Sequence, residues 1–104
     1  MGRDDDDELN LFLLKLKENR PNKEQLGQYH SLVKTVNVIW KSGLVKVKYH
    51  GSFLQYNRRL LNKYMRHTDK HFVMTSFERK LKHFQMQVVK TTHGPNAVKK
   101  WMFK

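Results

Sequence analysis

The spacing of apolar residues alternates along the chain between the period of a helix and the period of a strand, and this order restricts the possible folds. The first apolar stripe recurs at i, i+3, i+4 and i+7, which predicts a helix that ends before Pro21. This stripe consists of Leu9, Phe12, Leu13 and Leu16. From Val36 the period becomes two, in segments 36–40 and 45–49, which are separated by Lys41-Ser42-Gly43. We therefore expect a two-stranded hairpin after the first helical region.

The segment between Pro21 and that hairpin has a weaker helical pattern. Asn22 and Gln25 have the spacing of a capping box, which predicts the start of a further short helix. Gly27 opposes a helix because glycine loses more backbone entropy than other residues when it is ordered. The apolar stripe that would continue this helix is Leu26, Tyr29, Val33 and Val36.

Two further helices are predicted in the middle of the chain. Ser52 is expected to cap the first of them, and Thr75 and Glu78 have the capping-box spacing that starts the second. The first has a broad apolar face made of Phe53, Leu54, Leu60, Leu61, Tyr64 and Met65, and the second has a stripe made of Phe77, Leu81 and Phe84. The opposite faces of both helices are basic.

The chain closes with a second hairpin pattern. Val88 and Val89 return to strand character, His93-Gly94-Pro95-Asn96 reads as a turn, and segment 98–103 supplies the last strand. An isolated hairpin is barely stable in water, so the two hairpins are expected to pair and to lie against the helices. The predicted fold class is α+β, a winged helix-turn-helix with three main helices and two β-hairpins that form a small antiparallel sheet.

Charge divides the chain into two parts. Residues 1–8 contain one arginine and five acidic residues, a net charge of −4, and are expected to form a flexible acidic head. Residues 9–104, the expected domain, contain 20 basic and 4 acidic residues, a net charge of +16. Such a surface attracts polyanions over about a Debye length, roughly 8 Å at physiological salt. Charge alone leaves nucleic acid and anionic membrane as partners.

Residues 9–103 resemble the winged-helix DNA-binding domains of the ETS and heat-shock-factor types. The first apolar stripe is similar to the L-x-x-F-L-L-x-L helix of ETS domains, and Val38-Ile39-Trp40 is similar to the first strand of both families. Segment 76–84, SFERKLKHF, resembles the heat-shock-factor motif S-F-x-R-x-L and the ETS motif R-x-L-R-x-Y, with Lys82 in place of the second arginine. The resemblance implies a divergent relative that binds double-stranded DNA within a nuclear transcription or chromatin regulator.

This resemblance implies that the helix from about residue 75 to 86 lies in the major groove. Arg79 and Lys82, one turn apart, are then the expected base-contacting residues, and His83 is a further candidate. Phosphate contacts are expected from hydroxyl and basic side chains on this helix, the preceding helix and the wing. These candidates are Ser76, Lys80, Arg58, Arg59, Lys63, Arg66, Lys70, Lys90, Lys99 and Lys100.

The aromatic residues are expected in the core, which counts against a single-strand binder that stacks bases on exposed rings. They are Phe12, Trp40, Phe53, Tyr64, Phe77, Phe84, Trp101 and Phe103. The chain has no cysteine, and His67 and His71 have only Asp69 nearby as a third ligand, so we expect no metal and no cofactor. No phosphate-binding glycine loop or nucleophile motif occurs, so we expect no enzyme and no small-molecule substrate. The longest apolar run is too short for a membrane span.

Two alternative functions fit the same residues. One is a winged-helix module that docks on an acidic protein surface and binds DNA weakly or not at all. The other is recognition of structured RNA, although the major groove of an A-form helix is too narrow for a protein helix.

Overall fold

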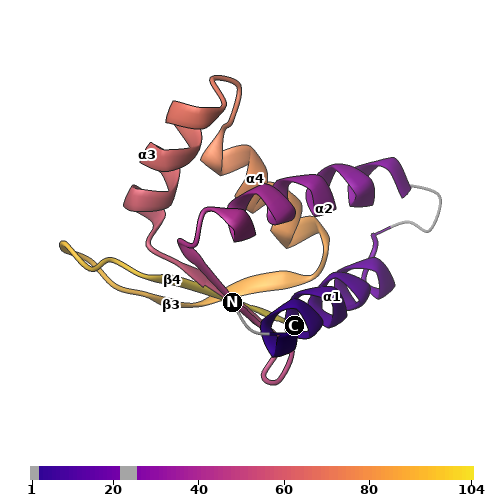
Figure 1. Ribbon diagram of the computed structural model, residues 1–104. Helices are drawn as coiled ribbons and strands as arrows, with labels where there is room; N and C mark the ends of the chain where they lie inside the picture. The colour runs from indigo at the N-terminus through magenta and orange to yellow at the C-terminus, as the bar shows by residue number, and fades with distance from the viewer. Residues whose placement is uncertain (1–2, 22–25) are drawn as a thin grey trace.

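The computed structural model of the chain describes residues 3–21 and 26–104, which form four helices and four strands (Figure 1). The order in the chain is helix, helix, hairpin, helix, helix, hairpin. The elements are α1 (Arg3–Glu18), α2 (Leu26–Lys41), β1 (Val45–Lys48), β2 (Phe53–Tyr56), α3 (Arg58–Thr68), α4 (Met74–His83), β3 (Met86–Thr91) and β4 (Lys99–Phe103). The expected α+β class is confirmed, with four helices in place of three.

The four strands form one antiparallel sheet in the order β1-β2-β4-β3. The two hairpins join through β2 and β4, where Leu54 pairs with Trp101. Two hairpins pair with each other as expected, but the first consists of β1 and β2, so the expected hairpin of segments 36–40 and 45–49 is wrong. The β3–β4 hairpin extends beyond the helices at one end of the molecule (Figure 1).

The core lies between the helices and one face of this sheet. Trp101 of β4 and Leu54 of β2 are fully buried, and their neighbours in sequence point to the opposite face. Helix α1 covers the end of the sheet opposite the extended β3–β4 hairpin (Figure 1). There the ring of Phe12 lies 5.6 Å from that of Phe103. The hydroxyl of Tyr29 on α2 donates a hydrogen bond of 3.0 Å to the carbonyl of Leu13 on α1.

The expected strand at 36–40 is wrong, because this segment forms the last turns of α2. The buried residues of α2 are spaced by three or four positions, as in a helix: Tyr29, Leu32, Val36 and Ile39. Branched side chains at 36–39 favour a strand locally, but burial of this stripe favours the helix. The expected capping box at Asn22 and Gln25 lies outside the described residues.

The strand that pairs with β1 is β2, in a segment expected to begin a helix. Ser52 has a φ of 48° and lies in the turn between the strands, where its amide donates a 2.8 Å hydrogen bond to the carbonyl of Tyr49. The expected cap at Ser52 is therefore wrong. Helix α3 begins six residues later, at Arg58, and Asn57 is its cap, with a side-chain oxygen 3.1 Å from the amide of Leu60.

The expected core aromatics are only partly confirmed. Phe12, Phe77, Phe84 and Trp101 are buried. Trp40 and Phe103 are half-buried and pack against the core, whereas Tyr64 is 41% exposed and Phe53 lies half-buried on the outer face of the sheet. The predicted apolar face of α3 is also too broad, because Leu61 and Met65 are buried but Leu60 is exposed.

The acidic head is continuous with the first helix, since α1 begins at Arg3. Glu8 is half-buried, and its carboxylate accepts a hydrogen bond from the amide of Tyr49 in the β1–β2 turn. The last residue of the head thus contacts the body of the domain.

Candidate nucleic-acid interface

Helix α4 has a buried face and an exposed face of different chemistry. Met74, Phe77 and Leu81 are buried at helical spacing and fix the orientation of the helix on the core. Arg79 lies at the centre of the opposite face. The exposed residues of the helix are Thr75, Ser76, Arg79, Lys82 and His83, and none of them is acidic. The three expected base-contacting residues thus share the solvent side of α4.

The one acidic residue of α4, Glu78, is buried rather than part of a capping box. Helix α4 begins at Met74, and its cap residue Val73 makes no side-chain hydrogen bond, so the capping role expected for Thr75 and Glu78 is wrong. Only 6% of Glu78 is exposed. A buried carboxylate needs partners that offset its loss of water.

Glu78 has three such partners, one from each of three other elements. Its oxygens lie 3.1 Å from Nε of Arg58 on α3 and 3.2 Å from Nζ of Lys99 on β4. The hydroxyl of Tyr56 on β2 donates a hydrogen bond of 2.7 Å to the same carboxylate. Nε1 of Trp101 donates in turn to the Tyr56 oxygen at 2.8 Å. This network joins α3, α4 and both hairpins at one buried point.

Tyr56 is uncharged in this network. Burial of its hydroxyl raises its pKa far above the usual value of 10.0, and the hydrogen bond to Glu78 and the charge of Glu78 raise the pKa further. The hydroxyl therefore keeps its proton and remains a donor to Glu78. One carboxylate faces two cations, so the network leaves a net positive charge near the first turn of α3.

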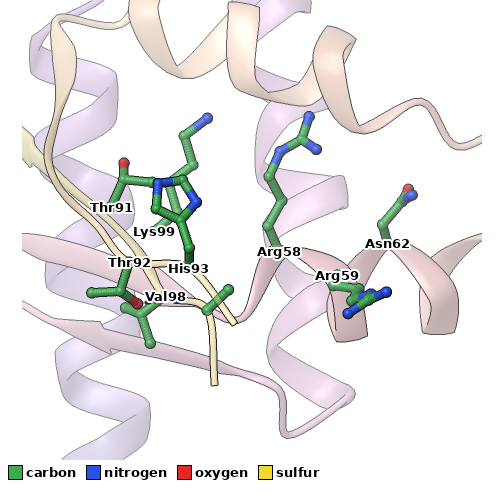
Figure 2. A pocket seen from close by; sticks show the side chains of 9 residues that line it. Arg58, Arg59, Asn62, Thr91, Thr92, His93, Val98 and Lys99 are labelled. Carbon is green, nitrogen blue, oxygen red and sulfur yellow. Dashed lines mark hydrogen bonds between the residues drawn. The ribbon is translucent and has the colours of Figure 1, made fainter. Parts of the chain in front are cut away.

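A cleft of about 430 Å³ lies between the start of α3 and the β3–β4 hairpin. Figure 2 shows Arg58 and Arg59 on the α3 side, with Lys99 and His93 on the hairpin side. Asn57 helps to hold the two sides together, because its Nδ2 donates a 3.3 Å hydrogen bond to the carbonyl of Pro95. The described residues that line the cleft are Arg58, Arg59, Asn62, Thr91, Thr92, His93, Ala97, Val98 and Lys99, none of them acidic.

A second cleft, of about 440 Å³, lies between α3 and the start of α4. It shares Arg58 and Asn62 with the first cleft and adds Arg66, Lys70 and Thr75. Asn62 is thus a polar side chain at both clefts that the sequence did not single out. The two clefts adjoin at Arg58 and Asn62 and together extend from the hairpin to the N-terminus of α4, with Phe72, Val73 and Met74 as the apolar part of the second.

The remaining expected phosphate contacts lie away from these clefts. Lys80 points towards α2, where its Nζ lies 3.1 Å from Oγ of Ser31, and it lines a small cavity with Ser76. Lys63 is on another side of α3, beside Leu60 and Tyr64. Lys90 and Lys100 are opposite each other on the sheet, and the Lys100 ammonium lies over the Phe53 ring on the outer face.

The sequence alone missed the role of Glu78. A usable signal exists, because residues 9–104 contain only four acidic residues among 20 basic ones. An acidic residue within such a basic helix is a strong candidate for an ion pair. Its partners, however, come from positions 20 and 21 residues away, which no local pattern identifies.

Within the described ranges, no group of three or more His, Asp or Glu side chains is arranged to hold a metal ion. No helix in the part of the chain that the structure describes has the length and apolar character needed to cross a membrane. A scan against models of known protein families finds no match, and searches of curated proteins and of solved structures find no significant similarity.

Proposed function

We propose that this chain is a winged helix-turn-helix domain that binds double-stranded DNA with sequence preference. The observation that carries the proposal is the exposed face of α4, which carries Arg79, Lys82 and His83 and no acidic residue, on a helix whose first residues line a basic cleft with α3. Consecutive helices α3 and α4 between two hairpins give the element order that such a domain requires. The proposal extends to a role within a nuclear transcription or chromatin regulator.

The dimensions of α4 suit the major groove. An α-helix with its side chains is about 10–12 Å in diameter, which matches the groove width of about 12 Å. Arg79 at the centre of the exposed face is placed to donate two hydrogen bonds to O6 and N7 of a guanine, and Lys82 reaches an adjacent base from the next turn. Each good bidentate contact discriminates by about 1–3 kcal/mol.

The clefts supply the phosphate contacts that position the helix. Arg59, Arg66 and Lys70 are exposed cations that no acidic residue lining the clefts opposes. Arg58 and Lys99 are held by Glu78, so their positions are fixed before DNA binds. Prearranged donors lose less conformational entropy on binding, and phosphate contacts set the register in which Arg79 meets the bases.

Titration of the domain with duplex DNA tests the proposal. The association constant should fall with salt with a logarithmic slope of about −0.9 for each phosphate contact that is neutralised. Arg79→Ala should lower the ratio of specific to non-specific binding by roughly 5- to 150-fold, whereas the control Lys34→Ala, an exposed change on α2, should leave the ratio unchanged. Equal losses on all sequences for Arg79→Ala would remove the base-reading role.

A specific surface supports a second candidate function, docking of an acidic protein segment. Leu60 is 50% and Tyr64 is 41% exposed on α3, and they line a groove of about 710 Å³ with Leu44. Lys63, Arg66 and His67 complete its lining. Apolar side chains with a basic rim fit an amphipathic acidic helix. A folded domain that binds no duplex at low salt would favour this function, and preference for double-stranded RNA in competition would favour RNA recognition.

A further inference from the structure

The outer face of the sheet, which points away from the core, carries a row of polar and basic residues. The strand registers align one residue from each of the four strands in this row. The row consists of Lys46 on β1, Gln55 on β2, Lys100 on β4 and Lys90 on β3. Neighbouring strands lie about 4.8 Å apart, so the row spans about 14 Å. Three ammonium groups and one amide thus cross the whole sheet.

This row lies on the face opposite the core. In each of three strands the residue next to the row is buried: Val47, Leu54 and Trp101. Because successive side chains in a strand point to opposite faces, the row points to the outside. The ammonium of Lys100 lies 4.3 Å from the centre of the Phe53 ring, a contact that holds this lysine on the outer face.

A bulge in β3 brings two of the lysines together. Val88 pairs with Trp101, so regular pairing would place Val89 opposite Lys100. The register shifts between Val88 and Lys90, and Lys90 pairs with Lys100 instead. Like charges directly opposite each other in a sheet destabilise it. Bulges are common in edge strands such as β3 and beside functional sites, and this one places Lys90 opposite Lys100 on the outer face.

Nothing in the strands compensates this charge, since none of their residues is acidic. The row offers hydrogen-bond donors from all four strands of the sheet. Phosphate oxygens are acceptors only, and a nucleic-acid backbone presents them in a series. The chemistry of the row is therefore complementary to a phosphodiester backbone.

We propose that the outer sheet face is a second phosphate-binding surface, which holds the backbone of a second duplex segment without reading its sequence. A lipid surface fits less well, because Phe53 and Met102 beside the row are half-buried and do not protrude as membrane-inserting side chains do. The second surface rests on the geometry of the sheet. Its consequence, that one domain joins two duplexes, rests also on the proposed function of α4.

The two surfaces are on different sides of the domain. Helices α2, α3 and α4 lie on one side of the sheet, and the outer face is turned away from them (Figure 1). A duplex on α4 therefore leaves the outer face accessible. The domain is expected to join two duplexes as a monomer.

A capture experiment tests this surface. Immobilised duplex is loaded with the domain, and capture of a second, fluorescent duplex is measured. The triple variant Lys46→Gln/Lys90→Gln/Lys100→Gln should reduce capture at least about tenfold and leave loading on the first duplex within about twofold. The matched control, Lys17→Gln/Lys34→Gln/Lys41→Gln, removes the same charge from exposed helix positions and should retain capture.

Thermal unfolding checks that the triple variant folds. At low salt its midpoint should lie close to that of the wild type, because removal of the repulsion between Lys90 and Lys100 offsets loss of the Lys100 contact with the Phe53 ring. Undiminished capture by a folded triple variant, or equal loss in the matched control, overturns the inference. Binding of phosphatidylserine vesicles or polyglutamate by this face, without capture of a second duplex, also overturns it.

The same assay separates this inference from the proposed function. Arg79→Ala should weaken sequence preference for the first duplex and leave the outer face intact. If Arg79→Ala changes nothing but the triple variant still loses capture, the function proposed for α4 fails and the second surface stands. If Arg79→Ala acts as expected and the triple variant retains capture, only the second surface fails.

Discussion

Nε of Arg58, the first residue of α3, lies 3.1 Å from the carboxylate of Glu78 at the centre of α4. This contact connects the two helices that the proposed DNA interface uses. Lys99 and Tyr56 bind the same carboxylate from the two hairpins, at 3.2 Å and 2.7 Å. Glu78 therefore fixes how α4 sits relative to α3 and the two clefts. In the proposed function it is a positioning residue, adjacent in sequence to Arg79.

Replacing Glu78 should lower the stability of the domain but strengthen its non-specific binding to DNA. Glu78→Gln keeps the shape but removes the charge that balances Arg58 and Lys99. We expect the free energy of unfolding to fall by about 2 kcal/mol, because two ion pairs are lost. The loss is not larger because both cations are partly exposed and regain water. Non-specific DNA binding should rise, because the variant no longer repels the phosphates with a negative charge. The rise should be at most about fivefold, since two unit charges 4 Å apart in water interact by about 1 kcal/mol. Sequence preference should fall as α4 loses its fixed orientation.

Urea unfolding and duplex titrations of the same Glu78→Gln preparation measure these effects. Glu18→Gln is the charge control, since it removes the same negative charge from an exposed position at the end of α1. Unchanged sequence preference in folded Glu78→Gln would contradict the positioning role.

The buried hydroxyl of Tyr56 predicts a loss of stability in alkali. Burial and Glu78 raise its pKa above that of the unfolded chain, so the folded state holds the proton more tightly. Its contribution is complete below about pH 10 and declines as pH rises further, when the unfolded chain ionises first. Burial also raises the pKa of Tyr29, which adds to the same decline.

Urea unfolding between pH 8 and pH 11.5 measures this decline. Tyr56→Phe should lower stability by about 1–3 kcal/mol at pH 8, because Trp101 and Glu78 lose a partner, and it should flatten the alkaline decline. A variant as steeply pH-dependent as the wild type would exclude Tyr56 as a cause.

Asn57 is expected to have two separable roles, as cap of α3 and as a tether of the hairpin. Asn57→Ala should cost about 1 kcal/mol, as loss of a helix cap does. Asn57→Asp keeps the cap to Leu60 but loses the donor to Pro95, so it should retain stability and loosen the cleft. Thermal unfolding and amide exchange of segment 92–98 distinguish the two variants. Similar stability loss in both would show that the cap contributes little.

Arg66 and Lys63 lie on different sides of α3, so their removal should change the salt dependence of duplex binding by different amounts. Arg66 lines the cleft between α3 and α4, whereas Lys63 lies only in the groove with Leu60 and Tyr64. Arg66→Ala should reduce the logarithmic salt slope of duplex binding by about 0.9, and Lys63→Ala should reduce it by clearly less. Titrations at several salt concentrations measure both slopes. A larger change for Lys63→Ala would place the DNA path on the other side of α3.

Elements with a single consistent period could be predicted from the sequence. The stripe of α1, the helix around Arg79 and the closing hairpin are found where periodicity places them, because local preference and burial agree there. The sequence pattern predicts a strand at 36–40 and a helix at 53–56, whereas the structure has a helix at 36–40 and a strand at 53–56. Their branched and aromatic residues suit either state, and only packing against the core decides between them.

The site was predictable in its residue types more than in its geometry. The exposed side of α4 follows from helical spacing, so Arg79, Lys82 and His83 share one face as expected. The position of Lys90 depends on a bulge, and the burial of Glu78 depends on partners from distant elements. Both are set by tertiary structure, which a local pattern does not contain.

Selection from a pool of random duplexes, carried out in parallel with the wild type and Arg79→Ala, tests the central claim most directly. We predict that the wild type enriches a short core containing guanine, and that Arg79→Ala loses preference at one or two adjacent base pairs of that core. A flat profile for the wild type, or the same core enriched by both proteins, would contradict base reading by α4.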